Sequence, residues 1–244
     1  MTTFSVFDDS GDFFDYSGYF NASSFFIDAF FDFFGDLAFE AQSANSTTIT
    51  IFNPDTGITT TATGTGFAFL GPLGDETPIA GTISSLSMVD NNLQPIGEVT
   101  GLAWSLVEFS NVLGAVELGD LQPAADLLNA GGPITVDGSA ALGGLIMFDL
   151  LTPELTALIT QPITVIGSPD YDEVYGGAGD DTILFGFGDN SDFIGGFVGA
   201  TFGNDTIDFS NATPFDFPWF SYSEFIDGAV TCLLYTSPSP RDRG

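Results

Sequence analysis

The sequence predicts a mainly β protein, in which a β-rich N-terminal module with a few short helices precedes an array of short strands. Three observations support this fold class. The segment 47–52 alternates β-branched polar and apolar residues, which is typical of a half-buried strand. From residue 167 onward, Gly- and Asp-rich turns alternate with short apolar segments. The chain is 44% hydrophobic, enough for a core despite a formal net charge of −31.

Composition divides the chain into five parts. Residues 1–45 form a Phe- and Asp-rich segment that we expect to be helical in part, and residues 46–165 form the β-rich module. Repeats occupy residues 166–210, and residues 211–231 end the natural sequence. We interpret residues 232–244 as an artefactual tail.

The Phe-rich segment contains one predicted amphipathic helix over residues 24–37. Ser24, Asp28, Asp32 and Asp36 recur every four residues and form a polar stripe, while phenylalanines cover much of the remaining surface. We favour packing of this helix on its own domain. The alternative is a docking helix for self-association or for a cell-surface partner.

The β-rich module is predicted to contain a hairpin, three further strands and three helices. The hairpin joins strand 47–52 to strand 58–62 through the turn 53–57, which contains Pro, Asp and Gly. The further strands are expected at 66–70, 79–89 and 96–100, and the helices at 104–113, 120–130 and 153–160. The predicted domain boundary is 160–167, where the last helix gives way to the repeats.

The most specific motif is the nonapeptide 176–184, which matches the pattern G-G-x-G-x-D-x-U-x in full, where U is a large apolar residue. Its glycines let a six-residue turn adopt backbone angles that other residues avoid, and Asp181 ends this turn. The nine residues before it keep Gly at position 1 and place Asp172 at position 6. Asp192 and Asp205 begin two further Asp-x-apolar units, after steps of 11 and 13 residues.

These repeats resemble the RTX (repeats-in-toxin, hemolysin-type) calcium-binding repeats of bacterial proteins. The resemblance implies that residues 166–210 form a short, irregular parallel β-roll, in which Ca²⁺ ions lie between turns two repeats apart. By that rule the turn of Asp172 faces that of Asp192, and the turn of Asp181 faces that of Asp205. The further ligands that it implies are carbonyl groups of Gly176, Gly177 and Gly179.

The rest of the composition excludes several kinds of chemistry. Residues 232–242 resemble a translated sequencing adapter and hold the single Cys and one of the two Arg, the other being Arg243. Residues 1–231 therefore contain no Lys, Arg, His or Cys, which excludes Ser-His-Asp triads and thiol nucleophiles and disfavours zinc sites. Nucleic acids and anionic membrane surfaces would repel the chain. No apolar run is long enough to span a membrane.

The leading hypothesis is a secreted, non-catalytic calcium-binding protein, extracellular or attached to the cell surface, whose repeats fold when they bind extracellular Ca²⁺. Carboxylate and carbonyl oxygens suit this hard cation. The RTX resemblance implies type I secretion, without a cleaved N-terminal signal. Two alternatives remain: a surface-layer or adhesive structural protein, and a fragment of an RTX-secreted hydrolase such as a two-carboxylate glycosidase.

Overall fold

The computed structural model describes residues 1–7, 41–52, 58–71, 77–141, 153–169, 172–184, 193–195, 203–208 and 230–233. The predicted helix 24–37, the turn 53–57 and Asp192 lie outside these residues.

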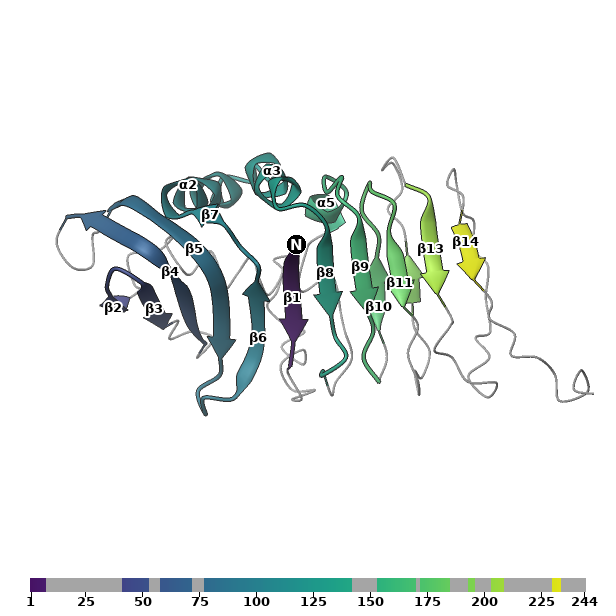
Figure 1. Ribbon diagram of the computed structural model, residues 1–244, viewed down its shortest axis with the longest axis horizontal. Coiled ribbons are helices and arrows are strands. Elements are labelled where there is room, and N and C mark those ends of the chain that lie inside the picture. Colours follow the sequence, from purple (N-terminus) through teal and green to yellow (C-terminus); the bar gives the residue numbers. More distant parts are fainter. Residues whose placement is uncertain are drawn as a thin grey trace, which may run out of the picture.

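A mixed sheet of twelve strands spans the described part of the chain (Figure 1). Its antiparallel part has the strand order β2-β3-β4-β5-β6-β1, and β7 pairs with β5. Its parallel part continues from β1 through β8, β9, β11, β13 and β14. The strands of the antiparallel part are β1 (Thr2–Val6), β2 (Ala41–Ala44), β3 (Thr48–Phe52), β4 (Thr59–Leu70), β5 (Thr77–Val89), β6 (Pro95–Thr100) and β7 (Trp104–Ser105). The predicted mainly β fold class is confirmed.

The strand β1 lies in the middle of the sheet, although its residues belong to the segment that we predicted to be Phe-rich and partly helical (Figure 1). It pairs with β6 in the antiparallel sense and with β8 (Ile134–Asp137) in the parallel sense. Phe4 is buried between Val99 and Val136 of these two strands. The β-rich module therefore begins earlier than predicted, because both β1 and β2 belong to its sheet.

The predicted hairpin 47–62 is confirmed, since β3 and β4 pair in the antiparallel sense. The separate strand predicted at 66–70 is wrong, because β4 continues from Thr59 to Leu70 without a break. The glycines at 64 and 66 lie where the register with β5 shifts, and Gly66 has a φ of 67°, so they form irregularities within one long strand.

Three helices of the described part lie along one edge of the sheet, at the upper ends of the strands in Figure 1. They are α2 (Leu106–Glu117), α3 (Gln122–Ala130) and α5 (Pro153–Thr156). The helix predicted from residue 104 begins two residues later, because Trp104–Ser105 pairs with β5. The Ser105 hydroxyl then caps α2 by accepting from the Glu108 amide, at 3.3 Å. The helix predicted over 153–160 is wrong in length, since α5 ends at Thr156.

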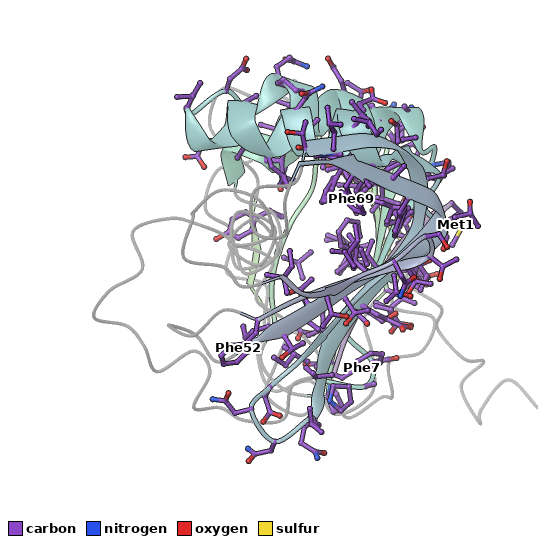
Figure 2. All side chains as sticks on the ribbon, turned by 90° about the vertical axis from the view of Figure 1, so that its left-hand side faces the viewer. Met1, Phe7, Phe52 and Phe69 are labelled. Carbon is purple, nitrogen blue, oxygen red and sulfur yellow. The ribbon has the colours of Figure 1, made fainter. Side chains whose placement is uncertain are left out.

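The two sides of the curved sheet are distinct in Figure 2. Phe69 lies beneath the helices on the inner side and packs against the core, whereas Met1 lies on the outer side and is exposed. Among the described residues, no helix is long and apolar enough to cross a membrane.

In the repeat region, successive strands alternate between two sheets. The strands β9 (Ile163–Ile166), β11 (Thr182–Leu184) and β13 (Asp205–Asp208) lie in the large sheet, with β14 (Val230–Leu233) after them. The strands β10 (Glu173–Tyr175) and β12 (Phe193–Gly195) form a second, two-stranded parallel sheet. The predicted boundary 160–167 contains β9, which pairs with β8 on one side and β11 on the other, so one sheet continues across it.

Among the described residues, one hydrophobic core follows this continuous sheet. It includes Phe4 and Leu86 of the module together with Val165, Val174 and Ile183 of the repeat region. The strand β14 contains the first two residues of the predicted artefactual tail and pairs with β13; residues 234–244 lie outside the described part.

Threonines occupy equivalent registers on seven neighbouring strands, and in the strands before β14 each lies next to a buried apolar residue of its own strand. The row consists of Thr100, Thr3, Thr135, Thr164, Thr182, Thr206 and Thr231. Threonine suits this position because its β-branched side chain favours extended backbone and packs against cross-strand neighbours.

Candidate functional site

The candidate site is the turn 176–181, which connects β10 to β11. Asp181, at its end, is 1% exposed. Its Oδ2 accepts from the backbone amide of Gly177 at 2.5 Å, which closes the turn. Its Oδ1 accepts from the backbone amide of Ile163 at 2.8 Å, which joins the turn to β9. One buried carboxylate therefore holds both the turn and the neighbouring strand.

The glycines of this turn are required by close contacts. A Cβ atom on Gly176 would lie 2.8 Å from Oδ2 of Asp181, and one on Gly177 would lie 2.8 Å from the carbonyl oxygen of Ile159. A Cβ atom on Gly179 would lie 2.6 Å from the carbonyl oxygen of Gln161. None of the three glycines has a positive φ. Our prediction that they supply unusual backbone angles is wrong; they allow neighbouring backbone and the carboxylate to approach.

Asp172 closes the preceding turn in the same way. Its Oδ2 accepts from the backbone amide of Ser168 at 2.8 Å, again four residues earlier in the chain. Its Oδ1 accepts from the Ser168 hydroxyl at 2.6 Å, and the carboxylate is buried. A Cβ atom on Gly167 would collide with Oδ2 of Asp172. The Gly at position 1 and the Asp at position 6 of the motif are thus one structural unit, repeated in two successive turns.

Asp205 lies directly beside Asp181, as the predicted pairing of their turns requires. The backbone amide of Asp181 donates to Oδ1 of Asp205 at 3.0 Å, and the adjoining residues of β11 and β13 are in parallel register. The backbone amide of Asn204 donates to Oδ1 of Asp180 at 2.8 Å. A Cβ atom on Gly203 would collide with the carbonyl oxygen of Gly179. The two turns therefore lie one on the other.

The residues that the structure describes place no Lys, Arg or His side chain beside these carboxylates. Burial raises the pKa of Asp181 to about 6; hydrogen bonds from Ile163 and Gly177 oppose this, and the charges of Asp205 and Asp180 add to it. Burial also raises the pKa of Asp205, where the hydrogen bond from Asp181 opposes it and the charge of Asp180 adds to it. Because residues 1–231 contain no Lys, Arg or His, no side chain in them can compensate these carboxylates, which leaves protonation or a bound cation to do so.

The donor atoms at this place fit Ca²⁺ in kind. A carboxylate has about four lone-pair positions, so each oxygen of Asp181 that accepts one amide keeps a further position for a cation. Within the described ranges, no three or more Asp, Glu, His or Cys side chains gather as a metal-binding group. A cation beside Asp181 and Asp205 would therefore also need backbone carbonyl or water oxygens, which Ca²⁺ accepts.

The predicted ligands fall into two groups. Gly176, Gly177, Gly179, Asp181 and Asp205 come together along the large sheet. Asp172 precedes β10 of the second sheet, where Glu173 pairs with Phe193. Asp192 directly precedes Phe193 in the sequence and lies outside the described residues.

Two contributors to the site were not among the predicted residues. Asp180 lies within the nonapeptide, and its acidity was a visible signal. Ile163 donates its backbone amide to Asp181 from 18 residues earlier in the chain, a contact that no local pattern marks. Comparisons with protein-family models, curated proteins and solved structures find no match to this chain.

Proposed function

We propose that the chain is a secreted, non-catalytic calcium-binding protein in which residues 166–210 form a parallel β-roll. The observation that carries this proposal is the buried carboxylate of Asp181, which lies beside Asp205 within a full match to the nonapeptide. The strands β9 to β13 alternate between two sheets, and within each sheet they pair in the parallel sense, which supports the β-roll.

In this proposal, Ca²⁺ couples ligand binding to folding. Without calcium, repulsion between the carboxylates opposes closure of the repeats, and the chain stays extended for export. In a calcium-rich exterior, the ion binds oxygens of Asp181 and Asp205 and compensates their charge. Because calcium binds the folded repeats better than the unfolded chain, it stabilises them by mass action. By the pairing that the RTX resemblance implies, Asp172 and Asp192 would share a second ion.

A calcium titration of the full chain tests the proposal. We expect far-UV circular dichroism to show a cooperative gain of β signal with Ca²⁺ and not with Mg²⁺, which demands stricter octahedral geometry. Isothermal titration calorimetry should show that Asp181→Asn weakens calcium binding by about 10- to 100-fold, because a charged ligand is lost.

The matched control is Asp126→Asn, which removes the same charge from an exposed position on α3. It should bind calcium as the wild type does. A folded protein whose spectrum and calorimetric signal ignore calcium would contradict the proposed function, and so would equal effects of the two substitutions.

A further inference from the structure

Two equivalent hydrogen bonds relate three neighbouring strand starts, of which two carry an aspartate and the third carries Ile163. Oδ1 of Asp205 accepts from the backbone amide of Asp181, and Oδ1 of Asp181 accepts from the backbone amide of Ile163. The registers of β9, β11 and β13 place Thr164, Thr182 and Thr206 side by side, so the three residues just before them are also neighbours. Ile163 therefore occupies the place of an aspartate in the preceding row.

The loop 156–162, which leads into β9, directly supports the turn 176–181. The backbone amide of Ala178 donates to the carbonyl oxygen of Ile159 at 2.7 Å. Gly177 and Gly179 lie so close to the carbonyl oxygens of Ile159 and Gln161 that a Cβ atom would collide with them. Gly203 lies on Gly179 in the same manner one row later. The loop 156–162 therefore contacts the turn 176–181 as the turn before Asp205 does on its other side.

One side chain of the helical layer fixes the conformation of this loop. Oδ1 of Asn129, on α3, accepts from the backbone amides of Thr160 at 2.8 Å and Gln161 at 3.3 Å. Its Nδ2 donates to the carbonyl oxygen of Leu158 at 3.1 Å. Three hydrogen bonds from one amide group leave the loop little freedom, and they connect it to a helix about 30 residues earlier in the sequence.

We propose that the loop 156–162 is a metal-free first row of the repeat stack and that Asn129 is a positioning residue for the turn 176–181. The row holds this turn in its folded geometry before calcium binds, and a preorganised turn binds the ion more tightly because less ordering remains to be done. The tighter binding of calcium rests on the proposed function. The positioning of the turn 176–181 by the loop and Asn129 does not depend on calcium.

Amide hydrogen exchange of the full chain, followed by mass spectrometry, tests the first row in the absence of calcium. We expect peptides covering residues 176–183 to be protected in the wild type. In Asn129→Ala they should exchange about tenfold faster, as should residues 158–163, because one or two net hydrogen bonds are lost. Unchanged protection of β5 and β6 would show that the variant is folded.

Two further variants separate positioning from a general loss of stability. Asn129→Asp keeps the acceptor for Thr160 and Gln161 but places a carboxylate oxygen against the carbonyl oxygen of Leu158, so it should restore only part of the protection. Gln122→Ala removes the bond from Gln122 to Asp126 on the exposed side of the same helix and should leave the turn unchanged. Wild-type exchange of residues 176–183 in Asn129→Ala, or a wild-type turn that is unprotected without calcium, would overturn the proposal.

Calorimetry distinguishes this inference from the proposed function. If the wild type binds calcium, Asn129→Ala should raise the dissociation constant about tenfold and Asn129→Asp should raise it less. Unchanged affinity in Asn129→Ala would refute the positioning role and leave calcium binding intact. A wild type that binds no calcium would refute the proposed function, and the exchange of residues 176–183 would still decide whether the loop acts as the first row.

Discussion

Asp172 and Asp181 have the same position in successive repeats, yet their carboxylates make different contacts. Each accepts a hydrogen bond from the backbone amide four residues earlier, that of Ser168 or that of Gly177. The second oxygen of Asp172 accepts from the Ser168 hydroxyl within its own turn. The second oxygen of Asp181 accepts from Ile163 in the neighbouring strand. The same motif therefore closes a turn in one repeat and also joins strands in the next.

The difference has an electrostatic consequence. Asp181 lies beside Asp205 and Asp180, whose charges add to the effect of burial on its pKa. A repeat that stacks on another repeat thus accumulates charge that it cannot compensate from within residues 1–231. Protonation of Asp181 should therefore affect the stability of the folded protein.

The largest expected effect is the response of the calcium-free protein to pH. The pKa of Asp181 is about 6 in the folded protein, above its ordinary value of 3.8. The folded protein retains a proton that the unfolded chain loses between these values, so the free energy of unfolding falls as pH rises through this range. The decrease due to Asp181 is at most about 3 kcal/mol. Urea denaturation with a calcium chelator, from pH 4 to pH 7, measures it.

Repulsion among the other carboxylates also lowers stability as pH rises, so variants are needed to isolate this contribution. Asp181→Asn should flatten the curve by the amount that Asp181 contributes. Asp172→Asn should keep the steeper slope, because Asp181 is still present. Parallel curves for the wild type and Asp181→Asn would show that the two aspartates do not differ as proposed.

A smaller effect on stability is expected when the first glycine of either turn, Gly167 or Gly176, is replaced by alanine. In Gly176→Ala the new Cβ atom would lie 2.8 Å from Oδ2 of Asp181, and the carboxylate would have to move away from the Gly177 amide. We expect a loss of about 1–3 kcal/mol in the free energy of unfolding, the cost of a disrupted buried hydrogen bond. Gly167→Ala should cost a similar amount through Asp172. Chemical denaturation followed by circular dichroism measures both.

The control is Gly114→Ala in α2, where a Cβ atom would have no neighbour within 4 Å. Alanine is the better helix former, so this variant should be more stable than the wild type by about 0.5–1 kcal/mol. A loss of stability in all three variants would argue against close contact as the reason for the glycines at positions 167 and 176.

Much of the fold could be predicted because local patterns determine it. The hairpin of β3 and β4 and the helix α3 follow from alternation and helical spacing over enough residues to be recognised. The strand β1 was missed because its alternation covers only five residues next to a Phe-rich stretch. Its place is decided by β6 and β8, which lie far away in the sequence.

For the candidate site, the sequence could predict which residues form the acidic cluster but not all of their contacts. The nonapeptide identified Asp181, and the hydrogen bond between Asp181 and Asp205 agrees with the pairing of their turns that the RTX resemblance implies. The contacts of Asn129 could not be predicted, because its hydrogen bonds join segments about 30 residues apart and nothing distinguishes it within a helix. The physical reason for the glycines required atomic distances to the loop 156–162.

The smallest effect concerns contacts between strands, in the antiparallel and the parallel parts of the sheet. The hydroxyl oxygens of Thr50 and Thr61 lie 3.4 Å apart, whereas Thr164 lies between Thr135 and Thr182 in the parallel row. Thr50→Val should lose roughly 0.5–1 kcal/mol with this hydrogen bond. Thr164→Val should be nearly neutral, because valine keeps the β-branched shape that packs the row, while Thr164→Ala should cost roughly 0.2–1 kcal/mol. If valine at 164 costs as much as alanine, hydroxyl groups rather than packing join the parallel strands.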